Sequence, residues 1–432
     1  MTQPAKKLLP PERLLTIEKP IYGGAFLARD GGKAVFVPLT LPGEQARVRI
    51  VEDKRSHAVA EAEEIVAPSA DRIAPACRHF GTCGGCNYQH ATYAAQLGLK
   101  QAILRETLER AGVAAPDRIE VLSGEPWGYR NRIRLAFDGN GKPGYRGRRS
   151  HAVVPIAECP IAVPLLVRAA LALGGLMHEL KPAARPAEVS LFCDKDETAL
   201  LAGISASGTA RFPFERICSA LAAQIPQLAG AESSAVSRDG RPGRIDADWG
   251  AGSLTYDAAG FDYRVDHGAF FQVNRWLVDQ LADRVTAGHS GSLAWDLFAG
   301  VGLFARRLAE SFSHVAAVES SPASTSALAH NLAGTNASAV KSTTLDFLRR
   351  ATQGQRPDLI VLDPPRTGLD PESAKLLAKI AAPSVVYVSC DPATLARDLR
   401  ALIGSGYAIE SLTLADLFPQ TFHLESIVRL RR

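Results

Sequence analysis

Residues 292–319 read SLAWDLFAGVGLFARRLAESFSHVAAVE. An apolar run leads into DLFAGVG at 296–302, helical spacing follows, and a second apolar run ends at Glu319. Small residues in a strand-to-helix turn let the backbone approach a ligand at the carboxyl end of a parallel sheet. Strand-like and helix-like runs continue to alternate to the end of the chain, which predicts a doubly wound parallel sheet from about residue 266.

The glycine-rich turn is a weak signal alone, because ordinary strand-to-helix turns share it. Glu319 adds to it, since a carboxylate about 20 residues further on can accept hydrogen bonds from both hydroxyls of a ribose. Ala305 stands where a dinucleotide fingerprint would normally have its third glycine. The pattern therefore favours S-adenosylmethionine over a nicotinamide nucleotide, with Asp346 and Asp363 at the ends of the next two strands.

The segment DPPR at 363–366 is similar to the loop with which amino-methyltransferases hold a flat base. Those enzymes usually have an aromatic residue in the fourth position, where this chain has Arg366. This difference argues against methylation of an exocyclic amine.

A candidate nucleophile, Cys390, follows the apolar run SVVYV. This position predicts a thiol at the carboxyl edge of the sheet, beside the cofactor cleft. The alternative is a buried structural cysteine, which is a common fate of a free thiol. We expect the N-terminus of a helix at 394–402 to lower the pKa of this thiol.

A thiolate can add to carbon 6 of uracil and make carbon 5 nucleophilic enough to take a methyl group. A general base must then remove the proton from carbon 5. Glu425 is the first candidate for this base and His423 the second. The alternative for Glu425 is a solvated loop carboxylate.

Composition sets the limits for the whole chain. It has 432 residues, 46% of them apolar, and a net charge of +4, which fits two to four folded domains and excludes wholesale disorder. No apolar run reaches the roughly 18 residues of a membrane span, and the first residues hold no signal-like stretch. We therefore expect a cytoplasmic protein with no membrane partner.

The N-terminal half has a different pattern of predicted secondary structure. Short β-rich runs at 13–50, separated by glycine turns, predict a small barrel. A loop rich in Cys, Gly and Pro follows at 73–90, then an amphipathic helix near 91–112, and a region of mixed strands with a helix at 163–180.

Residues 129–151 contain seven Lys or Arg with interleaved aromatic residues. Basic side chains neutralise phosphates and aromatic rings stack on unpaired bases, which favours RNA as partner. A solvated β-hairpin face is the alternative. The predicted RNA contacts in this segment are Arg130, Arg132, Arg146 and Arg148.

Together these motifs resemble the family of S-adenosylmethionine-dependent RNA 5-methyluridine methyltransferases. The matching segments are FFQVN at 270–274, DLFAGVG at 296–302, Glu319, DPPR at 363–366, SCDP at 389–392 and TFHLE at 421–425. The resemblance implies that Cys390 is the nucleophile, Glu425 the base and Phe270 a ring that stacks on the target base. It implies cofactor contacts from Gln272, Phe298, Gly300, Glu319, Asp346 and Asp363.

Three positions depart from the family pattern. Ala299 stands where members commonly have Cys, Leu303 where some have a polar residue that touches the cofactor, and Asp391 where Asn is usual. None of these changes removes a reacting group, although Leu303 weakens the case for a side-chain contact there.

The N-terminal half is similar to the iron-sulfur branch that modifies 23S ribosomal RNA. Cys77, Cys83, Cys86 and Cys159 match its cluster cysteines, whereas Cys193 and Cys218 read as packing residues. Four thiolates bind either a 4Fe-4S cluster or zinc, and the resemblance favours iron in a structural and RNA-binding role.

The resemblance implies an α/β chain of three domains. These are an OB-like TRAM barrel at 1–62 that binds RNA, a central α+β iron-sulfur and RNA-binding domain at 63–265, and a Rossmann-like class I methyltransferase domain at 266–432. Helix 91–112 is a candidate to pack on the catalytic domain.

The predicted activity is 5-methylation of a uridine in 23S rRNA by a monomer, with the target base extruded from its stack. The alternatives are the same chemistry on tRNA and a non-catalytic iron-sulfur RNA-binding protein.

Overall fold

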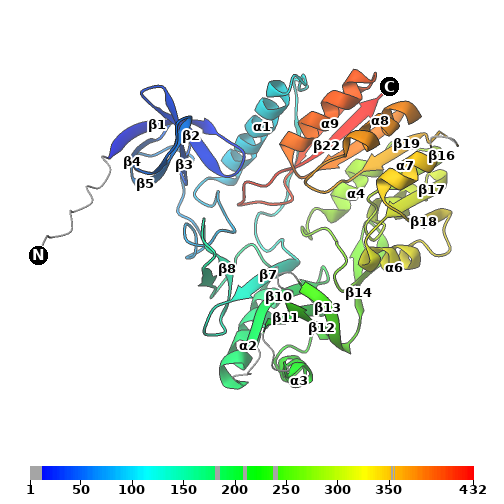
Figure 1. Ribbon diagram of the computed structural model, residues 1–432, viewed down its shortest axis with the longest axis horizontal. Coiled ribbons are helices and arrows are strands. Elements are labelled where there is room, and N and C mark those ends of the chain that lie inside the picture. Colours follow the sequence, from blue (N-terminus) through cyan, green and yellow to red (C-terminus); the bar gives the residue numbers. More distant parts are fainter. Residues whose placement is uncertain (1–11, 181–184, 208–211, 237–241, 352–353, 355) are drawn as a thin grey trace, which may run out of the picture. The chain divides into compact units, whose positions relative to one another are not determined.

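The computed structural model describes residues 12–432 except 181–184, 208–211, 237–241, 352–353 and 355 (Figure 1). The first eleven residues of the predicted barrel domain, 1–62, therefore lie outside the described residues. The chain divides into two compact units, one of Met1–Leu104 with Gln420–His423 and one of Arg105–Pro419 with Leu424–Arg432. No helix in the described part of the chain is both long and apolar enough to cross a membrane.

The first unit contains a closed five-stranded barrel with strand order β1-β2-β3-β5-β4. Its strands alternate buried and exposed side chains, and Ile17, Phe26 and Val37 are among the residues that fill the interior. The barrel predicted from the sequence is confirmed, although its last strand extends beyond residue 62. The strands are β1 Arg13–Pro20, β2 Ala25–Asp30, β3 Lys33–Pro38, β4 Gln45–Asp53 and β5 His57–Ala67.

A loop at 68–92 follows the barrel and carries three of the cysteines. It is fixed to the barrel by Arg72, which donates hydrogen bonds to both oxygens of the fully buried Glu44, at 2.5 and 2.7 Å. Burial alone would raise the pKa of Glu44, but the bonds from Arg72 and from two backbone N–H groups lower it below its usual value. The predicted helix follows as α1, Tyr93–Arg110, and ends before Gly112.

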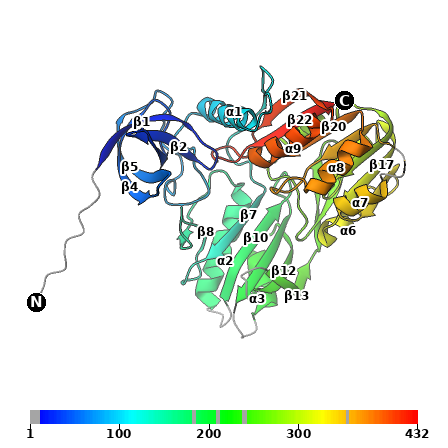
Figure 2. The same ribbon diagram turned by 45° about the horizontal axis from the view of Figure 1, so that its top comes forward.

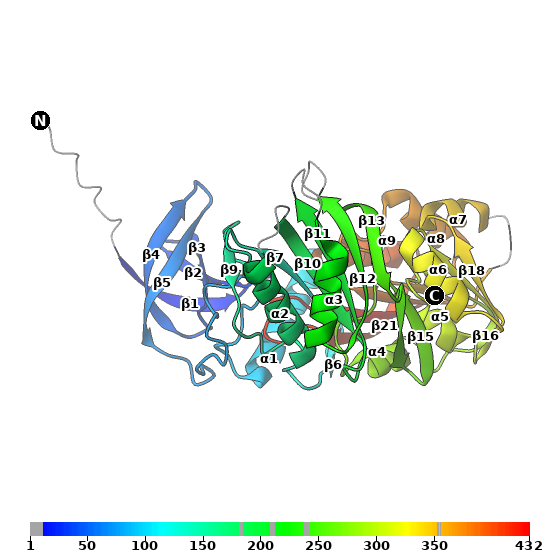
Figure 3. The same ribbon diagram turned by 90° about the horizontal axis from the view of Figure 1, so that it is seen from below.

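The second unit contains a seven-stranded central sheet in the order β13-β12-β11-β10-β7-β8-β9. Helices α2, Pro164–Leu180, and α3, Phe214–Gln224, lie side by side against one face of this sheet (Figure 3). Cys193 and Cys218 are buried in the resulting core, which confirms them as packing residues. The strands are β7 Arg132–Phe137, β8 Pro143–Arg146, β9 Val153–Pro155, β10 Arg185–Cys193, β11 Leu200–Ser207, β12 Leu228–Val236 and β13 Pro242–Gly250.

The same unit contains an eight-stranded sheet in the order β18-β17-β16-β19-β20-β22-β21-β6. Strands β16 to β20 pair in parallel and β22 is antiparallel to both neighbours, so the predicted doubly wound sheet is confirmed. The strands are β6 Glu120–Leu122, β16 Gly291–Leu297, β17 Phe312–Glu319, β18 Ala337–Lys341, β19 Leu359–Leu362, β20 Ser384–Ser389, β21 Ala408–Ala415 and β22 Glu425–Arg431.

Helices cover this sheet on both faces. On one face α7, α8 and α9 pack in succession (Figure 2), and on the other the side chains of α4, α5 and α6 join the sheet in one core. The helices are α4 Val278–Thr286, α5 Leu303–Leu308, α6 Pro322–Asn331, α7 Thr344–Ala351, α8 Pro371–Ile380 and α9 Pro392–Gly404.

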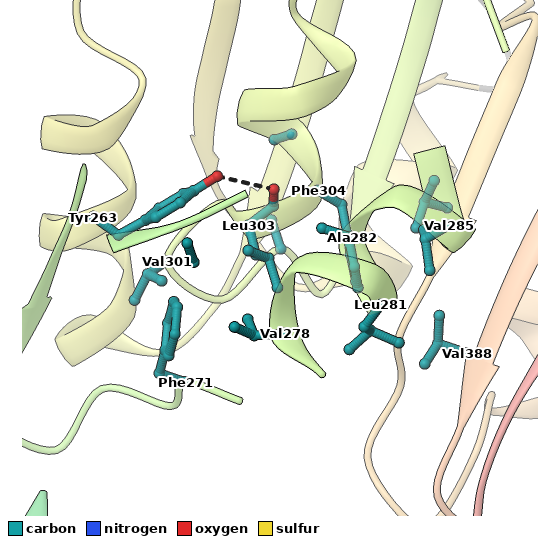
Figure 4. Close-up of a cluster of buried hydrophobic side chains, with 14 of the residues drawn as sticks. Tyr263, Phe271, Val278, Leu281, Ala282, Val285, Val301, Leu303, Phe304 and Val388 are labelled. Carbon is teal, nitrogen blue, oxygen red and sulfur yellow. Dashed lines mark hydrogen bonds between the residues drawn. The ribbon is translucent and has the colours of Figure 1, made fainter. Parts of the chain in front are cut away.

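The boundary predicted at residues 265 and 266 differs from the observed packing. The hairpin of β14, Ser253–Ala258, and β15, Phe261–Asp266, contributes buried side chains to the core of the eight-stranded sheet. Its Tyr263 packs with Phe271 and donates a hydrogen bond to the carbonyl of Leu303 at the start of α5 (Figure 4). Strand β6, also placed in the central region by the sequence, pairs with β21 in the same sheet.

Candidate active site

The loop that follows β16 has an unusual backbone. Phe298, Gly300 and Gly302 all have positive φ, at 68°, 57° and 97°. A Cβ on Gly302 would lie 2.8 Å from Leu328 of α6, so a glycine is required there, whereas a Cβ on Gly300 would meet no atom within 4 Å. The turn is therefore tight on its protein side and open at Gly300, as a ligand-binding turn should be.

Asp296 supports this loop from beneath. It is fully buried, and its Oδ2 accepts the N–H of Ala305 at 2.9 Å, which fixes the first turn of α5. Burial raises the pKa of Asp296 to about 8. The group is thus largely neutral at pH 7 and positions the loop, a role that the sequence analysis missed.

Glu319 lies at the tip of β17, as the sequence predicts. Its Oε2 accepts the N–H of Gly300 at 2.9 Å, and its Oε1 accepts the N–H groups of Ser320 and Ser321, both at 2.6 Å. These three bonds fix the orientation of the carboxylate. An oriented carboxylate beside an open glycine turn fits a ribose diol.

The loop at 267–277 carries the FFQVN motif. Phe270 is 56% exposed, whereas its neighbour Phe271 is buried in the core. The fully buried Asn131 donates its side-chain amide to the carbonyl of Gln272 at 3.0 Å and to the hydroxyl of Tyr256 at 2.9 Å. The loop is thus anchored shortly after Phe270, whose exposed ring can stack on a base.

Cys390 directly follows β20, and Glu425 is the first residue of the adjacent strand β22. Ser389 pairs with Ser426 across β20 and β22, so the next residue of one strand and the preceding residue of the other stand side by side at the sheet edge. Glu425 is only 6% exposed and Cys390 is half-buried. Asp363, at the end of β19, is close enough to affect the charge of both groups.

The electrostatics of this cluster favour the protonated state. Burial, together with the nearby Glu425 and Asp363, raises the pKa of Cys390 to about 11. Burial and the charge of Asp363 raise the pKa of Glu425 well above its usual value, although Arg366 opposes the shift. Burial also raises the pKa of Asp363.

The expectation that a helix N-terminus lowers the pKa of Cys390 is therefore wrong. Helix α9 does begin directly after the cysteine, but Asp391 is its N-cap and accepts the N–H groups of Ala393 and Thr394, both at 3.0 Å. The first N–H groups of the helix are thus satisfied by a carboxylate rather than directed at the thiol. Burial and the carboxyl groups of Glu425 and Asp363 therefore decide the direction in which the pKa of Cys390 shifts.

The loop that carries Arg366 is supported by a buried network. Asp398 of α9 accepts the hydroxyl of Tyr387 at 2.7 Å and the N–H of Leu369 at 2.8 Å. Arg397 donates to the carbonyls of Thr367 and Leu369, at 2.9 and 2.8 Å. These contacts hold the segment after the DPPR motif against β20 and α9.

Asp346 lies in the first turn of α7, with a half-exposed side chain. Its carboxylate accepts a hydrogen bond from Thr343 at 2.8 Å and pairs with Arg349 at 3.4 Å. These are local contacts, and its predicted role at the cofactor stays a prediction.

The four predicted metal ligands are half-buried. The Sγ of Cys83 accepts the N–H of Gly85 at 3.4 Å, and the N–H of Cys77 donates to Gln89 at 3.0 Å. The hydroxyl of Tyr145 lies 3.8 Å from the Sγ of Cys159. Within the described ranges, no group of three or more Cys, His, Asp or Glu is arranged as a metal site. The roles of Cys77, Cys83, Cys86 and Cys159 as metal ligands all stay predictions.

Two of the four predicted RNA contacts lie at the surface of the central sheet hairpin: Arg146 is exposed and donates to the carbonyl of His151 at 3.1 Å, and Arg148 is half-buried. The other two, Arg130 and Arg132, line a groove beside the FFQVN loop.

Comparison with known proteins gives consistent matches. A family model described as tRNA (Uracil-5-)-methyltransferase matches residues 240–432, and the TRAM domain model matches residues 12–63. The protein named 23S rRNA (uracil(1939)-C(5))-methyltransferase RlmD from Halomonas elongata is 33% identical over 97% of this chain and 89% of its own length. Its namesake from Aeromonas hydrophila is 33% identical over 100% of this chain and 99% of its own.

An RNA methyltransferase of Thermotoga maritima, described as uncharacterized, is 31% identical over 96% of this chain and 98% of its own. Among solved structures, the Pyrococcus abyssi tRNA (uracil-54, C5)-methyltransferase in complex with S-adenosyl-L-homocysteine covers 96% of this chain and 99% of its own. It has a TM-score of 0.78 at 24% identity, which supports the fold.

Proposed function

The chain belongs to the RNA uracil-5 methyltransferase family, and on that premise we propose that it transfers a methyl group from S-adenosylmethionine to carbon 5 of a specific uridine in 23S rRNA. Two relatives that match nearly the whole chain carry a 23S rRNA name, and this supports the ribosomal substrate. The TRAM match to residues 12–63 supports RNA as partner.

One observation carries the chemistry. A cysteine and a buried glutamate stand side by side at the carboxyl edge of the parallel sheet, in the same unit as the open glycine turn and Glu319. A nucleophile and a base on neighbouring strands can act on adjacent atoms of one pyrimidine ring. Cys390 would bond to carbon 6, and Glu425 would remove the proton from carbon 5.

When bound, S-adenosylmethionine supplies an electrophilic methyl group on a sulfonium. The thiolate of Cys390 forms a bond to carbon 6 of the uracil, and the ring electrons move toward oxygen 4. Carbon 5 would then form its bond to the methyl group while the methyl–sulfur bond of the sulfonium breaks, and the electron pair of that bond would stay on the sulfur. The carboxylate of Glu425 takes the proton from carbon 5, the carbon–sulfur bond breaks, and the thiolate leaves with its electron pair.

The raised pKa values of Cys390 and Glu425 have a consequence for this sequence. Without ligands, Cys390 holds its proton near neutral pH, and burial favours the protonated form of Glu425 as well. A cation placed beside three acidic groups lowers the pKa of each of them. The positive sulfonium therefore favours ionisation of the thiol when the cofactor is present, which links the reactivity of Cys390 to cofactor binding.

The residues of the cofactor loop fit the proposed ligand. Glu319 offers an oriented carboxylate for the ribose, and Gly300 leaves space above its Cα. Gln272, Phe298 and Asp363 are proposed as further contacts, and Phe270 as the ring that stacks on the extruded uracil.

Methyl mapping tests the proposal. Ribosomal RNA and tRNA from a deletion strain are compared by mass spectrometry with RNA from the same strain carrying the wild-type gene. We expect one 5-methyluridine of 23S rRNA to be missing and then restored, but not restored by Cys390→Ala. If the 5-methyluridine is missing from tRNA alone, the substrate is tRNA and the chemistry is unchanged. If no 5-methyluridine is missing from either RNA, the proposal is overturned.

The matched control is Cys218→Ala. This thiol is buried in the central core, where burial raises its pKa to about 12, and it should be inert. A Cys218→Ala variant that folds should restore the methyl group. Restoration by Cys390→Ala as well would favour the non-catalytic alternative.

We also propose that Cys77, Cys83, Cys86 and Cys159 ligate a 4Fe-4S cluster. The spacing of Cys77, Cys83 and Cys86 within ten residues and the position of Cys159 before a proline support this. The N–H donated to Cys83 Sγ also supports it, because bound cluster sulfurs commonly accept such bonds. An anaerobic preparation should be brown and contain iron and sulfide, and Cys83→Ala should lose both. A colourless protein that contains stoichiometric zinc would overturn the cluster proposal and favour a zinc site.

A further inference from the structure

The central sheet has an open face opposite α2 and α3. A groove of about 580 Å³ lies on this face, inside the second unit. This volume is within the range of about 300–1,000 Å³ that is usual for small-molecule pockets. The proposed reaction uses neither the groove nor most of its lining residues.

The strand register explains how the groove forms. Arg134 of β7 pairs with Ser190 of β10, Ser190 with Gly203 of β11, and Gly203 with Glu232 of β12. These four residues therefore form one row across the same face of the sheet. Gly203 leaves the middle of the row without a side chain, and the carboxylate of Glu232 lies close to that gap, with its Oε1 3.6 Å from where a Cβ on Gly203 would be.

An arginine with unused hydrogen-bonding capacity lies on the neighbouring row. Arg132 stacks on the ring of Phe192, with 4.2 Å from the guanidinium carbon to the ring centroid. Its Nε is buried and has no hydrogen-bond partner among the described residues. A buried donor of this kind is costly unless a ligand satisfies it.

The charges of the groove favour a neutral ligand. Its lining includes three carboxylates, and one of them, Glu188, already accepts a hydrogen bond from Arg134 at 2.9 Å. The lining also includes three arginines, so the groove offers a phosphate no net positive charge, whereas a flat ring with both donors and acceptors would satisfy both kinds of group. The ionisable lining residues are Arg130, Arg132, Arg134, Glu188, Glu232, Asp266 and His267.

The groove adjoins the candidate active site. Asp266, His267, Gly268 and Val273 line it, and they bracket the exposed ring of Phe270 in the same loop. The loop therefore lines the groove and also carries the ring proposed to stack on the target base. An RNA strand whose uridine stacks on Phe270 would bring a nearby nucleotide to the groove.

We propose that this groove binds a guanine base of the substrate RNA, distinct from the target uridine. Arg132 would donate to O6 and N7, as arginine commonly does with guanine, and Glu232 would accept from the N1–H and N2 amino groups on the other edge. Cytosine and adenine both lack the adjacent N1–H and N2 amino donors of guanine, which Glu232 would bind. The proposal rests on the proposed function for its RNA substrate and adds a second point of sequence recognition.

The experiment uses the full-length protein and a 23S rRNA fragment that contains the methylated uridine. Each guanosine near the target is replaced singly by inosine, which lacks the N2 amino group, and the dissociation constant and KM are measured. At one position inosine should weaken wild-type binding by about tenfold, the scale of losing a base contact. In Glu232→Gln the same replacement should have little further effect.

Gly203→Leu provides an independent test, because it fills the groove from its floor. Gly203→Ala is its matched control, since the added Cβ meets only contacts of 3.6 to 3.8 Å. Leu should weaken RNA binding about tenfold and raise KM with little change in kcat, while Ala should change both less. Folding of each variant is checked by circular dichroism.

The failures are distinguishable. If the wild-type protein methylates no RNA, the proposed function fails, and the binding measurements still test the groove. If no guanosine is sensitive to inosine, or if folded Gly203→Leu binds the fragment like wild type, the guanine site is overturned. Equal sensitivity to inosine in wild type and Glu232→Gln would also overturn it.

Discussion

The carboxylate of Glu319 accepts a hydrogen bond from the N–H of Gly300 at 2.9 Å, and so joins the tip of β17 to the glycine turn after β16. Two further N–H groups hold its second oxygen. The orientation that a ribose diol needs is thus fixed before any ligand binds, and the cofactor pays little ordering entropy at this point.

Glu319→Gln should therefore weaken cofactor binding about 10- to 100-fold, because an amide cannot accept with both ends. The affinity for S-adenosylhomocysteine is measured by calorimetry. Glu310→Gln is the matched control, since Glu310 forms a surface pair with Arg307. Equal affinities for wild type and Glu319→Gln would remove Glu319 from the cofactor site.

The rate of the first turnover should rise with pH. Because the pKa of Cys390 is raised to about 11, the thiolate fraction increases about tenfold per pH unit below that value. Single-turnover rates between about pH 6 and pH 9 check this at cofactor and RNA concentrations far below saturation, where the rate reports the pKa of the free protein. Cys218→Ala should give the same profile, and a flat or falling profile would contradict the assignment.

Stability should fall as the pH rises through the range in which Asp296 titrates. Its pKa is about 8 in the folded protein against a usual value of 3.8, so the folded state binds more protons between these values. The stabilisation is complete below about pH 4 and is lost toward pH 8. The urea midpoint of Asp296→Asn should depend less on pH than that of wild type, and equal dependence would mean that Asp296 is ionised when folded.

Asp391 has a separable structural role as the N-cap of α9. Asp391→Ala should lower the free energy of unfolding by about 1 kcal/mol, whereas Asp391→Asn, the residue usual in the family, retains an acceptor and should cost less. Urea unfolding at neutral pH measures both. Equal losses would show that the charge of Asp391, rather than its cap, stabilises the protein.

The sequence predicted the parts of the fold that are local. The glycine turn, Glu319 and Cys390 each lie at the end of an apolar run, and the carboxyl ends of parallel strands meet at one sheet edge. The barrel and α2 were predictable because alternation and helical spacing are local patterns.

What the sequence did not show depends on pairing between distant segments. The three residues of β6 are too few to show a pattern that would predict their pairing with β21. The hairpin of β14 and β15 joins the core of the eight-stranded sheet through contacts such as the hydrogen bond from Tyr263 to Leu303, which are distant along the chain. The groove residues come together only through the register of β7, β10, β11 and β12. The raised pKa of Cys390 depends on Glu425 and Asp363, which are distant along the chain.

The central claim is that Cys390 forms a bond to carbon 6 of the target uridine. RNA with 5-fluorouridine at that position traps the bond. A base can remove a proton from carbon 5 but cannot remove fluorine, so the thiolate is not released. Peptide mapping of the product should find the modified nucleotide on Cys390, and Cys390→Ala should give no covalent complex. A complex on another cysteine, or undiminished methylation of natural RNA by Cys390→Ala, would contradict the account.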